Sequence, residues 1–399
     1  MKIFFISQRV PFPPDRGDKI TTFNEVRHLA RTNEVHVFCL ADGTTDLENV
    51  DGLRAITPNV TAVRLGRIRA RLRALFALLF TGRSFTEAFF NERELHRAVQ
   101  ERYRELQPDV VLVYSSGVAQ YADRLKDVPR VMQFADLDSL KWQQYALSAS
   151  RPMKWIYDAE AKRLLEYERH IATTFDLSLM STEAEKADFE QLIPGARVSC
   201  VANGVDLEYF RSNGAEKKPG NLVFTGVMDY LPNVDGVLWF AEEILPLIQE
   251  KVPSATFTIC GSKPLPRVES LASQKGVTVT GRVPDVRPYL DAAEIAVVPL
   301  RMARGIQNKL LEAMSMGLPC VSTSRAWHGV DATEGEGVVV MDDPAKFAGA
   351  VVALLQDDER RRESGLQARH AVERDYSWGP QLARLEAVLA DVTRTDPRP

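Results

Sequence analysis

The chain has 399 residues, which is enough for two or three domains of ordinary size. Hydrophobic residues make up 45% of it and charged residues 26%, which excludes a disordered chain, a fibrous repeat and a polytopic membrane protein. The formal net charge of −4 excludes a general polyanion binder, so a nucleic-acid role would need a local basic patch.

The cysteines and the apolar runs indicate in which cellular compartment the protein is expected. The four cysteines lie far apart, without a CxxC pair or a histidine at metal-ligand spacing, so reduced, buried thiols are expected in place of a zinc site or a disulfide framework. The first apolar run, residues 3–6, is too short for a signal peptide. The longest, residues 74–80, is too short to cross a bilayer. These features predict a cytoplasmic protein.

The first half of the chain alternates apolar strands with helical patterns. Strands are predicted at residues 2–7, 34–40, 109–114, 130–134 and 176–180. Helical periodicity lies between them, at residues 21–31, 91–106 and 153–173. This order predicts a mostly parallel sheet covered by helices.

The pattern restarts after residues 207–220, a stretch with little apolar content that is typical of a linker. Further strands are predicted at residues 221–225, 255–260, 295–299, 318–322 and 337–340, and helices at 234–250, 307–316, 344–355 and 360–374. Two doubly wound α/β halves follow from this reading. Ligands of such sheets bind outside the carboxyl ends of the strands, so the cleft between the halves is the expected site.

The segment 298–319 carries the strongest chemical signal. A strand ends in a loop with Arg301 and Arg304, and Gly305 then precedes a helix. A helix N-terminus offers free N–H groups to an anion, and a glycine there lets a phosphate approach the backbone. Asn308, Lys309 and Glu312 follow at spacings that share a helix face. An ordinary surface Lys–Glu pair on an amphipathic helix is the alternative.

Residues 299–319 resemble the signature of the retaining GT-B glycosyltransferases, the family 4-like group, which ends in Leu-Glu-Ala-Met and Gly-x-Pro. Three other segments, at 201–206, 222–226 and 279–283, resemble the family's interdomain segment, first donor strand and base-side turn. Residues 228–233 with 138–142 resemble bacterial sugar transferases of exopolysaccharide and PEP-CTERM/exosortase systems.

The resemblance implies two Rossmann-like domains facing across a cleft. Residues 1–205 would form the acceptor domain and residues 206–377 the nucleotide-sugar donor domain, with residues 378–399 crossing back onto the first. It further implies metal-independent transfer of a sugar from a nucleotide sugar to a glycan or lipid-linked acceptor with retention, and no cofactor. The donor would be bound by Gly226, Arg282, Gly305, Asn308 and Glu312.

Two departures from the family pattern concern charge. The first of two acids that the family often places seven residues apart is missing, and Arg304 stands eight positions before Glu312. Gly226 is followed by Val227 and Met228 where the family often has Arg and Lys. We expect Arg304 and Lys309 to stabilise the leaving diphosphate, because a guanidinium can bind it in bidentate fashion. A solvated loop residue is the alternative for Arg304.

Candidate residues of the first half are less specific. Asp136 and Asp138 follow a strand, where an acceptor-side or catalytic role competes with a structural loop or helix cap. Gly17, with Arg16 and Lys19 beside it, could meet an anionic acceptor, or could form a plain turn. The family's frequent histidine after the strand at 109–114 is absent.

Residues 64–83 carry six arginines and no acid, with large apolar residues at helical spacing. Such a stretch is typical of a membrane-surface helix, and predicts peripheral attachment to the inner face of the plasma membrane. A core-packed helix with a solvated basic face is the alternative; nucleic-acid binding is not expected, because few aromatic residues interleave with the arginines.

The sequence as a whole predicts a hexosyl- or other glycosyltransferase of bacterial exopolysaccharide or glycan assembly. A nucleotide-sugar epimerase on the same fold is one alternative, although the acids and histidines that it would need in the cleft are not apparent. A non-catalytic nucleotide-sugar-binding or scaffold protein is the other. Formation of a glycosylated product distinguishes the three.

Overall fold

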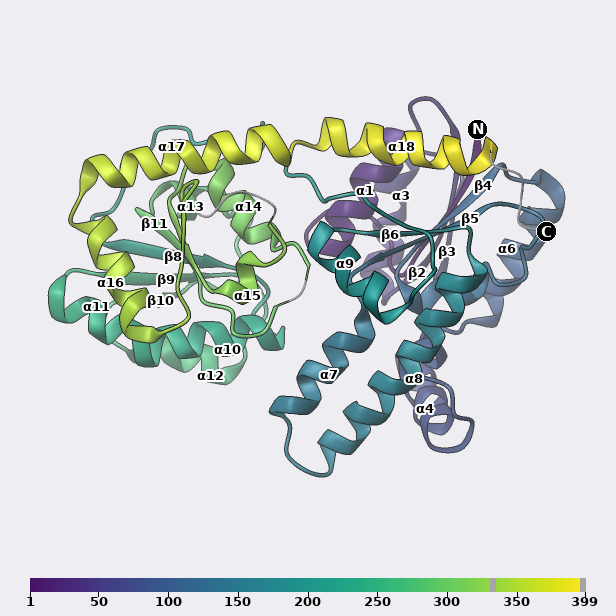
Figure 1. Ribbon diagram of the computed structural model, residues 1–399, viewed down its shortest axis with the longest axis horizontal. Coiled ribbons are helices and arrows are strands. Elements are labelled where there is room, and N and C mark those ends of the chain that lie inside the picture. Colours follow the sequence, from purple (N-terminus) through teal and green to yellow (C-terminus); the bar gives the residue numbers. More distant parts are fainter. Residues whose placement is uncertain (304, 331–334, 395–399) are drawn as a thin grey trace. The chain divides into compact units, whose positions relative to one another are not determined.

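The computed structural model describes residues 1–303, 305–330 and 335–394 and divides the chain into two compact units (Figure 1). Unit 1 combines Met1–Ala202 with the segment from Gly379 onward, and unit 2 is the continuous stretch Asn203–Trp378. The sequence-based boundaries after residues 205 and 377 lie three residues later and one residue earlier than these.

The described residues of unit 1 form a parallel sheet of seven strands in the order β3-β2-β1-β4-β5-β6-β7. The strands are β1 (Lys2–Ser7), β2 (Glu34–Ala41), β3 (Val60–Arg64), β4 (Val110–Tyr114), β5 (Arg130–Ala135), β6 (Leu177–Met180) and β7 (Val198–Cys200). The two edge strands, β3 and β7, escape prediction because short, half-buried strands carry a weak apolar pattern. The strand order reverses between β1 and β4, where a doubly wound sheet opens to a ligand.

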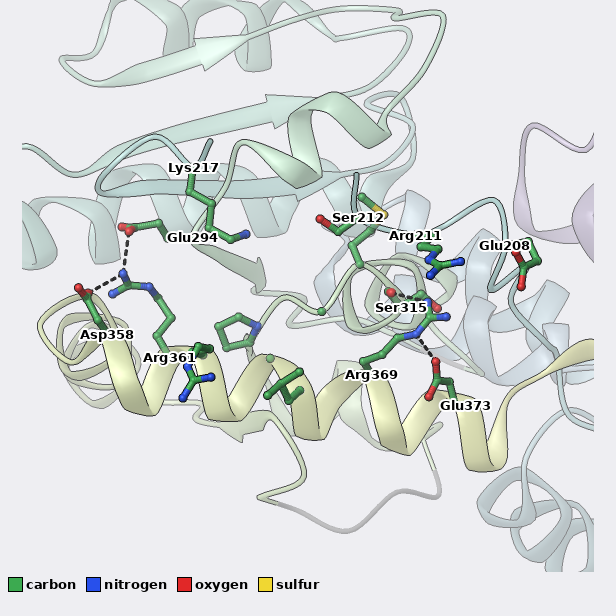
Figure 2. A pocket seen from close by; sticks show the side chains of 16 residues that line it. Glu208, Arg211, Ser212, Lys217, Glu294, Ser315, Asp358, Arg361, Arg369 and Glu373 are labelled. Atoms are coloured by element: carbon green, nitrogen blue, oxygen red, sulfur yellow. Dashed lines mark hydrogen bonds and ion pairs between the residues drawn. The ribbon is translucent and has the colours of Figure 1, made fainter. Parts of the chain in front are cut away.

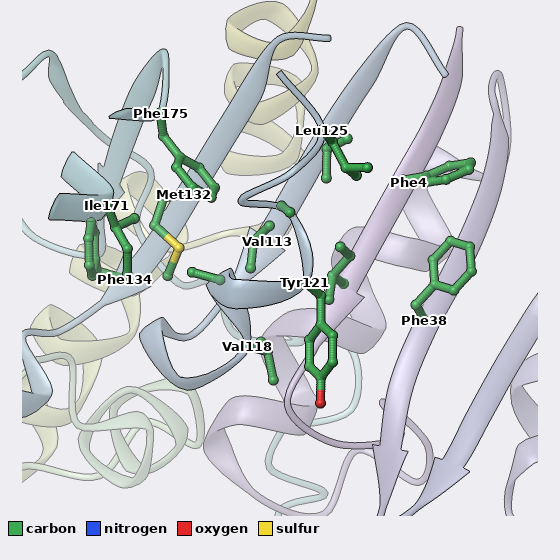
Figure 3. Close-up of a cluster of buried hydrophobic side chains, with 14 of the residues drawn as sticks. Phe4, Phe38, Val113, Val118, Tyr121, Leu125, Met132, Phe134, Ile171 and Phe175 are labelled. Atoms are coloured by element: carbon green, nitrogen blue, oxygen red, sulfur yellow. The ribbon is translucent and has the colours of Figure 1, made fainter. Parts of the chain in front are cut away.

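Helices cover the sheet of unit 1. They are α1 (Gly17–Leu29), α2 (Thr44–Glu48), α3 (Val50–Arg54), α4 (Arg67–Phe80), α5 (Phe85–Phe89), α6 (Arg93–Leu106), η1 (Ser116–Tyr121), α7 (Asp138–Ser148), α8 (Met153–Thr174) and α9 (Glu183–Leu192). Figure 3 shows the core on one face, where Phe4, Val113 and Met132 of neighbouring strands pack together with Tyr121 and Phe175.

The C-terminal helix α18 (Trp378–Arg394) completes the other face of the same sheet. Its Leu385, Leu389 and Val392 are buried in one cluster with residues of β1 and β2, including Ile3 and Val37. His28 and Asn33 hold Glu386 of this helix by hydrogen bonds. The predicted return of the C-terminal helix to the first domain is thus confirmed.

Unit 2 has a parallel sheet of six strands among its described residues, in the order β10-β9-β8-β11-β12-β13. The strands are β8 (Asn221–Thr225), β9 (Thr256–Cys260), β10 (Val277–Val279), β11 (Ile295–Val298), β12 (Cys320–Ser322) and β13 (Val338–Val340). The helices are α10 (Leu231–Trp239), η2 (Phe240–Ile244), α11 (Leu245–Lys251), α12 (Pro266–Glu269), η3 (Ser270–Ser273), α13 (Arg287–Asp291), α14 (Asn308–Ser315), α15 (Ser324–Trp327), α16 (Pro344–Leu355) and α17 (Asp358–Asp375).

The single helix predicted at 234–250 is irregular in the structure. Residues 240–244 form a π-helical turn between α10 and α11. Pro246 stands just inside α11 and has no N–H to donate into the preceding turn, so the backbone widens there.

Segments from both ends of unit 2 meet beside the unit boundary. Val205 pairs with Ser377 as a parallel bridge, and the Val205 N–H donates to the Tyr376 carbonyl at 2.8 Å. A Cβ on Gly204 would lie 2.6 Å from Cδ2 of Trp378, so only glycine fits. No helix among the described residues is both long and apolar enough to span a bilayer.

Candidate functional site

The strand order of unit 2 reverses between β8 and β11, and the loops that leave the carboxyl ends of these strands build the candidate site. The turn at Gly226 follows β8, and the loop leading to α14 follows β11. The predicted donor-binding residues Gly226, Asn308 and Lys309 therefore come from neighbouring strands of one sheet edge.

Glycines bring the backbone close together at this edge. A Cβ on Gly261, which follows β9, would lie 1.6 Å from the Gly226 carbonyl oxygen. A Cβ on Gly226 itself would lie 2.7 Å from Nδ2 of Asn233 and 3.3 Å from Cε of Lys309. The absence of side chains here leaves the Lys309 amine beside bare backbone, which is the arrangement that phosphate binding needs.

Lys309 lies at the first turn of α14 and is held from two sides. Its Nζ donates to Oδ1 of Asn233 at 3.1 Å and stands 5.4 Å from the ring centroid of Phe224. Asn233 is buried and donates through Nδ2 to the Val227 carbonyl, which fixes the orientation of its amide. Sequence reasoning did not single out Asn233 as a partner of Lys309, because an asparagine in the first turn of a helix is commonly a local cap.

Desolvation by burial is the largest cause of the pKa shifts of Lys309 and Glu312. It lowers the pKa of Lys309 to about 8, and the negative charge of Glu312 opposes that shift. It raises the pKa of Glu312 to about 7, against the positive charge of Lys309. Two groups with pKa values moved toward neutrality are a common mark of a functional site, and they differ from an ordinary solvated surface pair.

The glycine ahead of α14 is also tightly enclosed. A Cβ on Gly329 would lie 2.3 Å from the carbonyl oxygen of Gly305, so the segment after α15 packs directly on the loop before α14. Gly305 has a φ of 62°, which suits glycine. Asn308 accepts a hydrogen bond from Nδ2 of Asn203 at 3.5 Å. Arg304 lies outside the described residues.

The other arginines of this unit are placed differently. Arg301 forms a bidentate pair with Asp235, at 3.0 and 2.6 Å, and stacks over Trp239. Arg282 is exposed and follows β10, the edge strand of the sheet, with two strands between β10 and β11. It therefore lies on the same edge of the sheet as Gly226 but not on an adjoining strand.

The corresponding edge of unit 1 holds the predicted acceptor-side residues. Ser115 follows β4 with a φ of 82°, a conformation that is costly outside glycine, and its Oγ donates to Gln8 at 3.1 Å. Asp138 begins α7, accepts from Ser116 Oγ at 3.3 Å and lies 3.8 Å from Nζ of Lys141. Asp136 precedes it in the loop after β5 and is partly buried.

The cations expected to meet an anionic acceptor are paired within the protein. Arg16 precedes α1 and forms an ion pair with Asp18 at 2.7 Å, while Gly17 is the first helical residue. Lys19 is buried and paired with Asp46 at 3.0 Å. Neither pairing was predicted; Asp18 is a sequence neighbour of Arg16, whereas Asp46 of α2 meets Lys19 of α1 only through the fold.

Sequence reasoning also missed Glu25, which is buried beside this edge. It accepts from Nε2 of Gln133 at 2.7 Å, and its second carboxyl oxygen has no hydrogen-bond partner among the described residues. Burial raises the pKa of Glu25 to about 8. Nothing in the sequence distinguishes a buried glutamate of an amphipathic helix from one that is exposed to solvent.

A cavity of about 670 Å³ lies at the opposite edge of unit 2, between α17 and the amino ends of the strands (Figure 2). Arg361 pairs there with Glu294 at 2.8 Å and Asp358 at 2.6 Å, and Arg369 pairs with Glu373 at 2.6 Å. Arg361 and Arg369 are neutralised by acids and backbone carbonyls, and the cavity lies away from the carboxyl ends of the strands, where the ligands of a doubly wound sheet bind. Among the described residues, no cluster of three His, Cys, Asp or Glu side chains could hold a metal ion.

Comparison with known proteins accounts for both units. Residues 17–209 match the family model described as Glycosyltransferase Family 4, and residues 219–357 match Glycosyl transferases group 1. The chain is 14% identical to sucrose-phosphate synthase from Thermosynechococcus elongatus, with a TM-score of 0.74 over 98% of this chain and 99% of that one. This likeness establishes the GT-B fold.

Two curated relatives share more sequence. The D-inositol 3-phosphate glycosyltransferase of Corynebacterium efficiens is 26% identical over 60% of this chain and 61% of its own length. The UDP-Gal:alpha-D-GlcNAc-diphosphoundecaprenol alpha-1,3-galactosyltransferase of Escherichia coli is 26% identical over 62% and 67%. The chain thus spans about three fifths of the first curated relative it matches. It is related to the glycosyltransferases of families 1 and 4 and has their two-domain GT-B fold.

Proposed function

We propose that the protein transfers a hexosyl group from a nucleotide sugar to an acceptor hydroxyl. The observation that carries the proposal is the β8–β11 edge of unit 2, where Gly226, Asn233, Lys309 and Glu312 combine bare backbone, a partly desolvated amine and a carboxyl group. A nucleoside diphosphate fits this chemistry, with its phosphates on the glycines and Lys309 and its ribose hydroxyls on Glu312. Unit 1 would bind the acceptor, with Asp138 facing it.

The chemistry that we propose is leaving-group stabilisation. The C–O bond between the anomeric carbon and the diphosphate breaks, and the negative charge that develops on the diphosphate is met by Lys309, by the N-terminus of α14 and by Arg304. The departing phosphate takes the proton of the attacking hydroxyl, and the sugar is transferred with retention of anomeric configuration. The reaction needs no metal in this scheme.

The acceptor that we propose is a lipid-linked or polysaccharide glycan of bacterial exopolysaccharide assembly. The Escherichia coli relative is named for a UDP-linked donor and a diphosphoundecaprenol-linked acceptor, which is the chemistry we carry over. An acceptor of that kind lies in a membrane, so the proposal includes peripheral attachment at the cytoplasmic membrane face through residues 64–83.

Ligand-dependent thermal stabilisation tests the donor site. The wild-type chain is titrated with a panel of nucleoside diphosphates and nucleotide sugars, and bound ligand raises the melting temperature with the logarithm of its concentration over Kd. We expect a rise with one base only, which is lost in Glu312→Ala and kept in Glu359→Ala, an exposed glutamate of α17. The absence of any rise in the wild-type chain would contradict a preformed donor site.

Product analysis then separates the candidate functions. Incubation of the preferred nucleotide sugar with lipid-linked acceptors should give nucleoside diphosphate and a glycosylated lipid in equal amounts. Conversion of the sugar without acceptor would favour an epimerase. Binding without either product would favour a nucleotide-sugar-binding protein.

A further inference from the structure

The α7–α8 hairpin projects from unit 1 (Figure 1). Large apolar side chains lie at its free end, where Leu147 at the end of α7 is 82% exposed and Trp155 in the first turn of α8 is 62% exposed. Met153 and Ile156 are also more than a third exposed. We call these four exposed apolar residues the hairpin tip.

The base of the hairpin packs on the sheet core through Leu140 of α7 and Ile171 of α8, whereas its outer half has an aromatic contact of its own. Trp142 and Tyr145 of α7 pack on Tyr157 of α8, with ring centroids 5.4 and 6.2 Å apart. This aromatic seam joins the two helices behind the tip and holds the tip side chains outward. Exposure of Leu147 and Trp155 is therefore a fixed property of the hairpin.

Cations accompany the tip. The guanidinium of Arg151, in the turn between the two helices, stands 5.5 Å from the ring centroid of Trp155. Lys154 follows in the first turn of α8, donates to the Ala146 carbonyl at 3.3 Å and lies 4.0 Å from a carboxylate oxygen of Asp158. An apolar group with a tryptophan and an adjacent arginine and lysine matches the boundary between acyl chains and anionic headgroups.

Helix α4 presents a second surface of the same composition beside α8. Its buried side consists of Ala70, Ala74, Ala77 and Leu78, whereas Leu72 and Phe76 are 65% and 59% exposed. Most of the large apolar residues of α4 therefore do not pack in the core, which argues against the alternative of a core-packed helix. The Arg163 side chain of α8 donates to the Leu78 carbonyl, so α4 and α8 are neighbours.

The arginines in and just before α4 differ in whether an acidic side chain of unit 1 pairs with them. Arg67 and Arg73 are held by Asp42 and Glu92 within unit 1. Arg64, at the end of β3, and Arg69 and Arg71 of α4 are exposed, and none of the three side chains has an ion-pair or hydrogen-bond partner among the described residues. Their charge is free to meet anionic headgroups.

We propose that the hairpin tip inserts into an anionic lipid bilayer as a second anchor beside α4, so that unit 1 docks at two points. The inference deepens the membrane attachment included in the proposed function and rests on it for the presence of a lipid-linked acceptor. Two anchors on one rigid unit fix its orientation toward the bilayer, which a single helix cannot do. Their joint affinity also exceeds that of either alone, because the second binds at high effective concentration.

Vesicle sedimentation of the full chain tests the proposal. We expect binding to phosphatidylcholine vesicles that contain phosphatidylglycerol and little binding to phosphatidylcholine alone. The pair Leu147→Ser and Trp155→Ser should lower the partition coefficient roughly tenfold or more, as should Leu72→Ser with Phe76→Ser in α4. The matched control is Leu231→Ser with Leu366→Ser, two exposed leucines of unit 2, which should bind as wild type.

Trp155→Phe gives a readout that does not depend on loss of binding. Vesicles with brominated acyl chains should quench part of the tryptophan emission of the wild-type chain, and that part should vanish in Trp155→Phe while sedimentation stays within twofold. Equal quenching in both chains would overturn insertion of the tip. A wild-type dimer in light scattering that the tip substitutions dissolve, without vesicle binding, would show that a second copy covers the tip instead.

Nucleotide-dependent thermal stabilisation separates this inference from the proposed function. The tip variants should keep the wild-type rise in melting temperature with the preferred nucleoside diphosphate, because the tip lies in unit 1. Vesicle binding without nucleotide binding would contradict the donor site alone. Nucleotide binding without vesicle binding would contradict the membrane surface alone.

Discussion

The amine of Lys309 is largely removed from water in the fold, and this desolvation lowers its pKa to about 8. A diphosphate attracts the protonated form only. Nucleoside diphosphate affinity should therefore fall as the pH rises above about 8, by about tenfold per unit. Lys309→Met should weaken binding and remove this dependence.

Calorimetric titration at several pH values checks the prediction. Lys346→Met, at an exposed lysine of α16, serves as the control and should behave as wild type. An affinity that is flat in the wild-type chain through pH 8 and beyond would remove Lys309 from the proposed diphosphate contact.

Glu25 makes the free energy of unfolding depend on pH between about 4.5 and 8. Burial raises its pKa from 4.5 to about 8, so the folded chain keeps a proton that the unfolded chain has released. Its contribution is fully present below pH 4.5 and is lost as pH rises toward 8, on the order of 4 kcal/mol in all. Glu25→Gln should flatten this decline in urea unfolding, and Glu48→Gln, an exposed glutamate of α2, should not. An unchanged slope in Glu25→Gln would contradict the buried proton.

Individual side chains were the least predictable part of the site. The glycines and the Lys309–Glu312 spacing can be read from the sequence, because each depends on neighbours in the chain. Asn233 is 76 positions away from Lys309 and contacts it only through the fold. Glu25 and Gln133 are likewise joined across 108 positions.

Helix α8 braces two other helices with glutamates from one face. Glu160 accepts from the N–H groups of Phe85 and Thr86 at the start of α5, and Glu168 accepts from the Ser139 N–H at the start of α7. Each carboxyl group satisfies donors that a helix N-terminus leaves free, and burial raises the pKa of Glu168 well above its usual value. Asp138 stands next to the second of these contacts, so α8 also positions a proposed acceptor-side residue.

Glu160→Ala tests the brace at α5. It leaves two partly buried N–H donors without their acceptor, and we expect a loss of about 1–3 kcal/mol in the free energy of unfolding. Glu166→Ala changes an exposed glutamate of the same helix and should stay within about 0.5 kcal/mol of wild type. Equal losses in the two variants would show that helix propensity, and not the brace, is being measured.

Elements with strong periodicity were predicted well. The helices expected at 91–106 and 153–173 appear as α6 and α8 within two residues, because each has a continuous buried stripe. The start of α1 lies four residues before the predicted one, since its first turn is polar and carries no apolar signal. The π-helical turn before α11 could not be anticipated in detail, although Pro246 marks the irregularity.

At the scale of the whole molecule, α18 joins distant parts of the sequence. Leu389 is fully buried among residues of β1, β2 and β4, more than 270 positions away. Leu389→Ala should lower the free energy of unfolding of unit 1 by about 2–5 kcal/mol. The control Leu366→Ala, at a half-exposed leucine of unit 2, should cost far less.

Urea unfolding measures the loss, and nucleotide-dependent stabilisation shows where it falls. Because unit 2 is continuous and has its own core, Leu389→Ala should keep the nucleotide response of the wild-type chain. Loss of that response together with the stability of unit 1 would mean that the two units fold as one.

The position of α18 also sets the order in which a nascent chain can complete its two units. Unit 2 runs without interruption from Asn203 to Trp378, so all of its strands have been made before α18 is translated. Unit 1 begins first, but one face of its sheet is covered only in part, by α1 and α3, until Leu385, Leu389 and Val392 leave the ribosome. The unit that starts first therefore finishes last, and its uncovered strands are the surface that a ribosome-associated chaperone would meet for most of the translation time.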